Sequence, residues 1–238
     1  MESIDNIQNE IVGSFESQSE IRREKFNIVN KVGLIYAIGI AIMSQFEYIL
    51  LMIAKKYFSD FIKSNKDNAV LIGTLIVNQI LGPLLIFSLT KCIKRTEIKN
   101  NKYGLKKYLA NLCINSGLLI IGSLIGYIMQ FCFLYIFGNL SENKYNSAID
   151  LSFKNANIFL NFFIICFTAP IAEELMFRKL LIDRLSIYSK TLAIFTSGIL
   201  FGIFHINIHQ FFGAMFSGWS LAYSYAETTL SNFYLINY

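Results

Sequence analysis

Long runs of apolar residues, separated by short charged connections, dominate the chain. Two of them are Val32 to Ala54 and Asn68 to Thr90, and a third is centred on Cys113 to Phe137. A fourth begins at Asn155 and leads into a charged cluster that starts at Glu173. Each run approaches or exceeds the roughly 20 residues that an α-helix needs to cross a bilayer. The pattern therefore predicts helices embedded in a membrane.

The last apolar run, from Thr191 to Ala226, has no charged residue over 36 positions. As one helix it would be about 54 Å long, roughly twice the thickness of the hydrocarbon core. We expect it to break near Ile206 to Gln210 into two helices. The sequence thus predicts an all-α, polytopic membrane protein: a helical bundle of about six transmembrane helices, some re-entrant or tilted, with an intramembrane polar site.

Composition and charge agree with this class. Apolar residues make up 54% of the chain and charged residues 16%, which excludes a disordered chain and an ordinary soluble domain. The net charge of +5 comes from Lys and Arg in the connections, so we interpret it as a topology signal and expect no nucleic-acid partner. Fifteen of these residues fall on the side of the N terminus and six on the other. We therefore expect a multi-pass protein of the cell membrane with a cytoplasmic N terminus.

Two domains are expected. Ile4, Ile7, Ile11 and Phe15 recur at helical spacing, which predicts that residues 1–31 form a cytoplasmic amphipathic tail. Residues 32–238 form the membrane domain.

Ionisable residues interrupt the apolar background at Glu173, Glu174 and Arg178. A charged side chain at membrane depth costs at least ~2.5 kcal/mol, so such a cluster marks a functional site by default. Glu174 and Arg178 are four residues apart and can form an ion pair on one helix face, from which Glu173 is turned away. The structural alternative is an interfacial charge cap, but a cap does not need two adjacent glutamates just after Pro170.

Both histidines of the chain, His205 and His209, lie in the last apolar run. If the fourth and fifth runs form an antiparallel hairpin that turns at Tyr188 or Ser189, Glu173 and His205 are each sixteen residues, or about 24 Å, from the turn. They would then lie at the same level inside the bilayer. We expect the charged residues near the turn to stay in cytosol or headgroups: Asp183, Arg184 and Lys190.

A carboxylate that faces an imidazole away from bulk water is a common means of activating a water molecule. Phe201, one turn before His205, can shield this site from water. Two histidines and a carboxylate can also hold zinc, so a metal site of His205, His209 and Glu174 is a weaker alternative, and otherwise no cofactor is expected. The cysteines lack paired spacing and are expected to be packing residues: Cys92, Cys113, Cys132 and Cys166.

These residues resemble the motifs of the CPBP family of intramembrane glutamic peptidases, which includes type II CAAX prenyl proteases and bacteriocin-processing and self-immunity membrane proteins. The first motif, Glu-Glu-x-x-x-Arg, is matched by Glu173, Glu174 and Arg178. The second, Phe-x-x-x-His, is matched by Phe201 and His205. The catalytic region suggested by the resemblance is about 155–238.

The resemblance implies a membrane-embedded endopeptidase that acts on a peptide or membrane protein in contact with lipid. Glu173 would be the general base that polarises water, and His205 would help to position it. Glu174 and Arg178 would be supporting residues.

The family's third motif, His-x-x-x-Asn, usually supplies oxyanion donors, and we do not find it after the stretch Tyr223 to Thr229. The sequence is therefore expected to stop about one helix short of a complete site. Asn207 and His209 are the candidate substitutes as oxyanion donors. Loss of one such donor typically lowers the rate about 10²- to 10³-fold. The alternative is thus an inactive family member that acts as a bacteriocin-immunity protein or binds a membrane partner.

Overall fold

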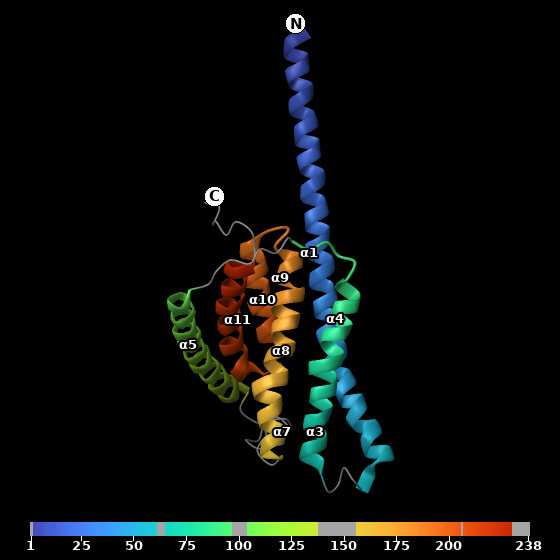
Figure 1. Cartoon of the computed structure of the whole chain (residues 1–238), viewed down its shortest axis with the longest axis vertical. Coiled ribbons are helices and arrows are strands. Elements are labelled where there is room, and N and C mark those ends of the chain that lie inside the picture. The colour runs from blue at the N-terminus through green and yellow to red at the C-terminus, as the bar shows by residue number, and fades with distance from the viewer. Residues whose placement is uncertain (1, 61–64, 97–103, 138–155, 206, 230–238) are drawn as a thin grey trace.

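In the computed structural model, the described backbone covers residues 2–60, 65–96, 104–137, 156–205 and 207–229, and side chains are described within it except at residues 2–17, 47, 51 and 134. The regular elements of these residues are all helices, and η1, η3 and η4 are π-helical (Figure 1). In chain order they are α1 (Glu2–Tyr57), α3 (Lys66–Thr74), η1 (Leu75–Leu81), α4 (Gly82–Thr90), α5 (Leu105–Phe137), α7 (Ile158–Phe163), η3 (Ile164–Thr168), α8 (Ala169–Glu173), η4 (Glu174–Leu180), α9 (Ile182–Leu185), α10 (Lys190–Phe204) and α11 (Ile208–Thr229).

Four helical stretches of the described residues are long and apolar enough to cross a membrane. They coincide with the first four predicted runs, and the protein is an all-α polytopic membrane protein. The stretches are Gln18–Tyr57, Lys66–Thr90, Leu105–Phe133 and Ile158–Leu185.

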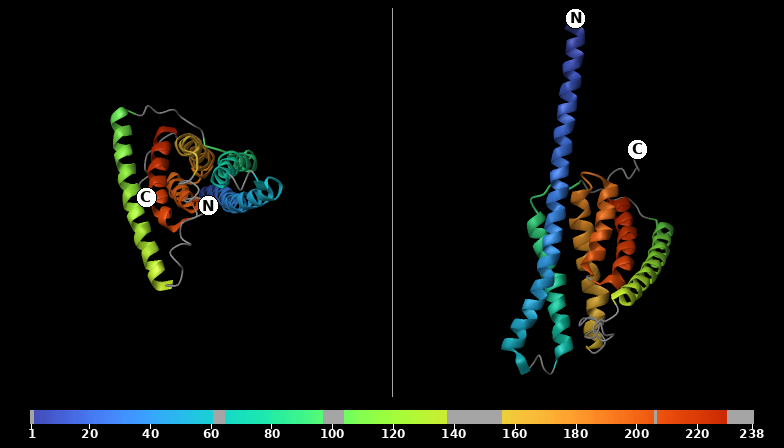
Figure 2. Two further views of the ribbon diagram at one scale, coloured as in Figure 1. Left: turned by 90° about the horizontal axis from the view of Figure 1, so that it is seen from below. Right: turned by 180° about the vertical axis from the view of Figure 1, so that it is seen from behind.

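The fifth run forms a hairpin of α10 and α11. α10 has 15 residues, so it is about 22 Å long and shorter than the roughly 30 Å core of a bilayer. Its junction with α11 lies short of the ends of α3 and α7, inside the length of the bundle (Figures 1 and 2). The helix break falls between Phe204 and Ile208, where the long uncharged run was expected to divide. Among the described residues, the hairpin thus adds one short apolar helix, α10, and the 22-residue helix α11 to the four stretches that could cross a membrane.

A capping residue begins each helix of this hairpin. The Ser189 side chain accepts a hydrogen bond from the Leu192 amide, and the backbone of Ser189 is extended. The turn between the fourth run and α10 is thus where the sequence predicted it. At α11 the Asn207 side chain accepts a hydrogen bond from the His209 amide at 3.0 Å. Both are the residue types that stabilise helix N-termini.

Two charged residues just before the first turn, Asp183 and Arg184, are buried by neighbouring helices, which the sequence did not predict. Asp183 and Arg184 are 1% and 5% exposed. The Asp183 carboxylate accepts a hydrogen bond from the Tyr225 hydroxyl at 2.8 Å. The Arg184 guanidinium donates to the carbonyl oxygens of Thr90 and Leu180, both at 2.9 Å. Hydrogen bonds from several helices therefore compensate the burial of these two charges.

The first span packs on the bundle through one face, formed by Val32, Tyr36, Ile40 and Met43, which are all buried. Their spacing of three and four residues places them on one side of a helix. α1 continues without a break on both sides of residue 31, where the tail was expected to meet the membrane domain, and its N-terminal part projects beyond the bundle (Figure 1).

α5 lies at the edge of the molecule and packs on α11. Seen from below, α5 is viewed along its length, beside α11 (Figure 2). A Cβ atom at Gly122 would come within 2.5 Å of the Phe212 carbonyl oxygen, so the two backbones are in close contact. The four cysteines are exposed rather than packed in the core, so that expectation was wrong.

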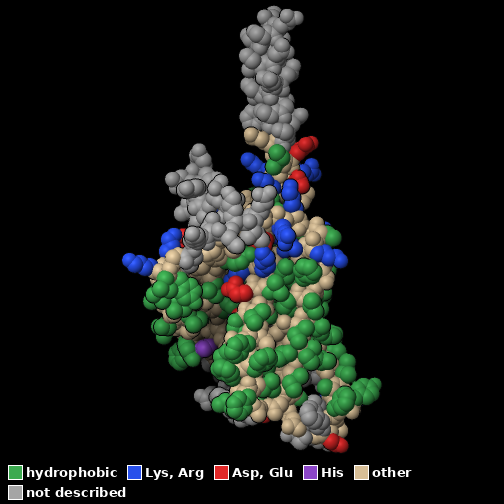
Figure 3. Space-filling view, viewed as in Figure 1, with side chains coloured by type: hydrophobic (Ala, Val, Ile, Leu, Met, Phe, Trp, Pro, Cys, Tyr) green, Lys and Arg blue, Asp and Glu red, His purple; other side chains and the backbone are tan. Residues whose placement is uncertain are grey.

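On the face seen in Figure 3, apolar side chains cover most of the bundle, and Lys and Arg gather at the end nearest the N terminus. Such a surface suits contact with lipid tails, and the basic residues suit contact with headgroups. The bundle thus offers a low-dielectric interior in which a buried polar site would be shielded from water.

Candidate active site

The site residues lie on an irregular membrane-spanning helix. Between Ile158 and Leu185 the chain alternates between α-helical and wider π-helical segments. The Leu181 amide, for example, donates to the carbonyl oxygen of Met176, five residues back, at 3.2 Å. Wide turns of this kind inside a helix are frequent at functional sites. This feature leaves no clear trace in the apolar pattern, and the sequence did not predict it.

Both prolines of the chain directly follow such a wide segment. Pro83 is the second residue of α4, after η1, and Pro170 is the second residue of α8, after η3. A proline within a helix lacks the amide donor and collides with the carbonyl four residues earlier. A locally wider helix accommodates both effects, which explains why the prolines are tolerated inside spans.

The adjacent glutamates have different surroundings. Glu173 ends α8 and is half-buried. Glu174 begins η4, and its side chain is 51% exposed. Its carboxylate lies 3.5 Å from Nε of Arg178, so the predicted ion pair forms. Arg178 also lies within electrostatic range of Glu173.

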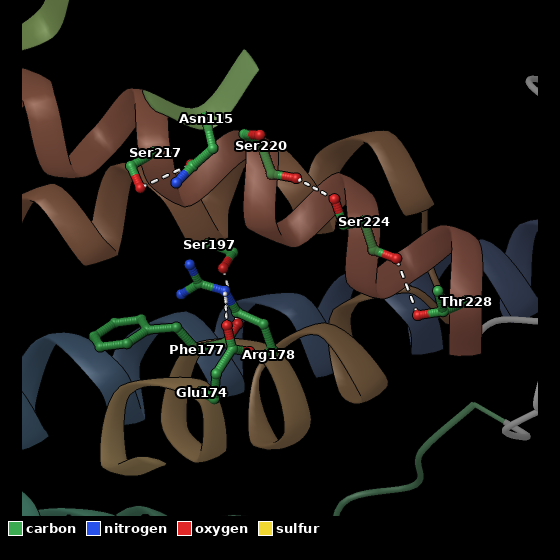
Figure 4. Close-up of polar contacts among 9 residues, drawn as sticks. All are labelled: Asn115, Glu174, Phe177, Arg178, Ser197, Ser217, Ser220, Ser224 and Thr228. Carbon is green, nitrogen blue, oxygen red and sulfur yellow. Dashed lines mark hydrogen bonds and ion pairs between the residues drawn. The ribbon is translucent and has the colours of Figure 1, made fainter. Parts of the chain in front are cut away.

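Arg178 is the most unusual side chain of the cluster, because its guanidinium is almost fully buried. It reaches inward toward α10, with the Glu174 carboxylate against Nε (Figure 4). Its central carbon lies 4.8 Å from the centre of the Phe201 ring, a cation–π contact. Nε and Nη1 have no hydrogen-bond acceptor among the described residues. The site thus holds a buried positive charge with unused donors beside two carboxylates.

Aromatic contacts set how the two helices of the site face each other. The ring of Phe177 lies 5.2 Å from that of Phe201 and 5.3 Å from that of Phe204. Glu173 is one turn before Phe177, and His205 is one turn after Phe201, on antiparallel helices. This register agrees with the common level inferred for the two residues. The structure brings His205 into contact with Phe201 and Phe204, whereas Glu173 and His205 make no recorded direct contact in the described part of the chain.

The two candidate oxyanion donors differ in position. Asn207 uses its carbonyl oxygen to cap α11 and lines a cavity of about 380 Å³. His209 packs edge-on against Tyr127 of α5, with ring centres 3.8 Å apart, and its Nε2 is buried without a partner within the described protein. The rest of the cavity is apolar, with walls from α1, α10 and α11: Ile40, Gly202, Ile203, Ile208 and Phe211.

The alternative zinc site is not assembled. Within the described segments, no three side chains of His, Cys, Asp or Glu come close enough together to bind a metal ion. His209 is turned to α5, while His205 packs among the aromatic rings of α10. The helix break separates the two histidines, so their spacing of four residues does not bring them onto one helix face.

Residues 155–235 match the model of a family described as type II CAAX prenyl endopeptidase Rce1-like. The match supports a relation of this region, about a third of the chain, to the CAAX protease family. The match begins where the resemblance was placed and contains both motifs, from Glu173 to His205, so the family inferred from the motifs is confirmed. Searches among curated proteins and among solved structures found no match.

The Rce1-like region includes α7 to α11, while α1 to α5 precede it. The CAAX protease family is a family of peptidases, and the two motifs that this chain shares with it meet at one interface, through the contact of Phe177 with Phe201. Sequence reasoning missed two side chains that reach this interface from neighbouring helices, Tyr36 and Ser197. In the sequence, these two residues differ from their neighbours only by a hydroxyl group on an otherwise apolar helix face.

Proposed function

We propose that this protein is a membrane-embedded endopeptidase in which Glu173 activates a water molecule and His205 assists. The observation that carries the proposal is the position of Glu173: a half-buried carboxylate inside a membrane span, one turn from the aromatic contacts that align it with His205. A carboxylate is rarely kept in such a place without a function.

Each member of the site has a separate role in this mechanism. Glu173 takes a proton from water as the oxygen attacks the peptide carbonyl, and His205 hydrogen-bonds the same water and keeps it aligned. Arg178 holds the two carboxylates in place by its charge, from a fixed position against Phe201. Glu174 is the exposed partner that fixes the first turn of η4.

The negative charge that develops on the peptide oxygen needs a hydrogen-bond donor. Asn207 suits this better than His209, because its carbonyl oxygen is held by the His209 amide and its NH₂ group is left for other partners. It also lines the cavity at the end of α10, which has room for an apolar substrate side chain. The substrate would then be a peptide or membrane protein that approaches through the lipid.

The gathering of basic side chains at the end of the bundle nearest the N terminus supports a cytoplasmic N terminus (Figure 3). A protein in this orientation would sit in the cell membrane as a multi-pass protein. Substrates would reach the site from the bilayer or its cytoplasmic face.

The first experiment compares Glu173→Gln with the matched Glu174→Gln. Both remove one charge at adjacent positions, but only the first removes the proposed base. With purified protein in proteoliposomes and a quenched fluorescent peptide ending in a farnesylated Cys-a-a-X sequence, we expect Glu173→Gln to lower kcat at least about 100-fold. Glu174→Gln should lower it less than about tenfold.

A search that assumes no substrate complements this assay. Membranes from cells that express wild-type or Glu173→Gln protein are compared for new peptide termini by mass spectrometry. Termini found only with the wild type would support the proposal. Identical termini, together with unchanged protection against a bacteriocin-like peptide when Glu173 and His205 are both replaced by alanine, would favour the inactive immunity protein.

A further inference from the structure

Three carbonyl oxygens of the wide segment η4 accept hydrogen bonds from side chains. The Tyr36 hydroxyl of α1 donates to Met176 at 2.5 Å, and the Ser197 hydroxyl of α10 donates to Phe177 at 2.8 Å. The Arg184 guanidinium donates to Leu180 at 2.9 Å. All three donors are buried.

These bonds add to a segment with irregular backbone pairing, in which the Met176 carbonyl accepts from the Leu181 amide five residues on instead of four. In a wide turn, carbonyl and amide groups lose the regular four-residue pairing. Inside a membrane no water replaces the lost partners, and an unpaired carbonyl is costly. Donors from α1, α9 and α10 therefore compensate the irregular segment from three directions.

The same segment carries the site. Glu173 directly precedes η4, Arg178 lies within it, and Phe177 makes the contacts that align it with α10. A return to regular α-helix would rotate the residues after Glu173 relative to those before it, since each residue of a wider helix advances through a smaller angle. Glu173, Phe177 and Arg178 would then no longer keep their present directions.

We propose that Tyr36 and Ser197 are positioning residues, which hold the wide turn of η4 and thereby keep Glu173 level with His205. Arg184 donates the third hydrogen bond, at the far end of η4. We call these three donors, Tyr36, Ser197 and Arg184, the clamp. Tyr36 lies outside the region matched by the family, on α1 in the N-terminal half of the chain, so the proposal extends the site beyond that region. The expected effect on catalysis rests on the proposed function, whereas the expected effect on the relative position of Glu173 and His205 does not.

The geometric test uses crosslinking and needs no activity. In a background without native cysteines, Glu173→Cys and His205→Cys are combined and treated in membranes with a short bifunctional thiosulfonate. We expect efficient crosslinking when the clamp is intact. Adding Tyr36→Phe and Ser197→Ala should lower the yield at least about threefold. The native positions replaced by alanine are Cys92, Cys113, Cys132 and Cys166.

Two control variants show whether losing any buried hydroxyl lowers the crosslinking yield, or only losing one that bonds to η4. Ser217→Ala removes another buried serine hydroxyl of the hairpin, which bonds to Asn115 of α5 and not to η4 (Figure 4). Tyr225→Phe removes a tyrosine hydroxyl that bonds to the Asp183 side chain. Neither control should change the crosslinking yield.

The catalytic test uses Tyr36→Phe and Ser197→Ala in the protein with Glu173 and His205 intact. Each should lower kcat about tenfold with KM within about threefold, as expected for loss of one buried hydrogen bond that acts on alignment. The double variant should lose about 100-fold. Ser217→Ala should keep kcat within about twofold.

The outcomes separate this inference from the proposed function. If crosslinking is unchanged in the double clamp variant, the positioning role is wrong, whether or not kcat falls. If crosslinking falls while even the wild type cleaves nothing, the clamp stands and the peptidase proposal fails. If crosslinking and kcat fall together, both are supported.

Discussion

Two long helices of this protein, α5 and the helix from Ile158 to Leu185, are similar in length and in apolar character, but they differ in almost everything else. α5 is a single uninterrupted α-helix of 33 residues, and after Lys107 it has no charged side chain. The other helix alternates between two geometries and carries six charged residues in its second half.

The surroundings of the two helices explain the difference. α5 packs on α11, and most of its apolar residues face outward, where lipid satisfies them. The irregular helix contacts α1, α4, α10 and α11, which supply donors to its backbone carbonyls and, from Thr90, an acceptor for Arg184. A membrane helix can therefore depart from regular geometry only where protein surrounds it.

Their polar contacts also differ in kind. α5 binds α11 through neutral side chains, with Asn111 bonded to Ser224 at 2.6 Å and Asn115 to Ser217 at 2.9 Å. These are contacts of the type that hold membrane helices together, worth about 0.6 kcal/mol each on average. The contacts of Arg178 and Asp183 instead hold charges, and a buried charge without its partner is far more costly.

The largest expected effect on the free energy of unfolding comes from removing the buried charged side chain of Arg178 on the irregular helix. Arg178→Ala removes the ion pair, the cation–π contact and most of the side-chain volume, and should lower the free energy of unfolding by about 3 kcal/mol. Glu174→Gln removes the same ion pair from its half-exposed end and should cost less than about 1 kcal/mol. Unfolding in mixed micelles with increasing SDS measures both.

Equal losses from the two variants would contradict this reasoning. They would mean that Arg178 acts only through Glu174 and that its burial against Phe201 contributes nothing. A larger loss from Arg178→Ala would instead show that the burial of the guanidinium, rather than the visible ion pair, makes this helix dependent on its neighbours.

The sequence predicted the fold well because its signals are local. A long run without charges had to bend, and the polar residues near Asn207 mark where it does. The register of the hairpin followed from equal distances to Ser189, and the contacts of Phe177 agree with it. The pairing of Glu174 with Arg178 followed from their spacing.

What the sequence did not reveal depends on other helices. The wide turn of η4 accepts hydrogen bonds from Tyr36 and Ser197, which lie 140 and 20 residues away from their acceptors. The burial of Asp183 and Arg184 depends likewise on Tyr225 and Thr90. Apolar periodicity records which residues avoid water but not which backbone groups lack partners, so it could not predict these contacts.

A second prediction concerns the packing of α5, with an intermediate effect. A Cβ atom at Gly126 would overlap with the backbone of His209, whereas one at Gly117, on the same helix, would have no atom within 4 Å. Gly126→Leu should therefore separate α5 from α11 and lower the free energy of unfolding by about 2 kcal/mol. Gly117→Leu should leave it within about 0.5 kcal/mol.

The same SDS titration serves for this pair, and the fluorescence of Trp219 on α11 gives a local readout. If both glycine variants are tolerated, the close contact of α5 and α11 is not needed for stability. If only Gly126→Leu is destabilising, α5 also has a specific packing surface, and this surface is confined to one face of the helix.

The smallest expected effect is at the exposed end of α5. Lys107 lies 2.6 Å from the Glu227 carboxylate, but its side chain is 65% exposed, so water and salt screen the pair. Lys107→Ala should change the free energy of unfolding by less than about 1 kcal/mol, and 0.5 M NaCl should reduce the difference further. A loss as large as that of Arg178→Ala would contradict the comparison, because a short distance between charges would then decide stability on both helices, whatever their burial.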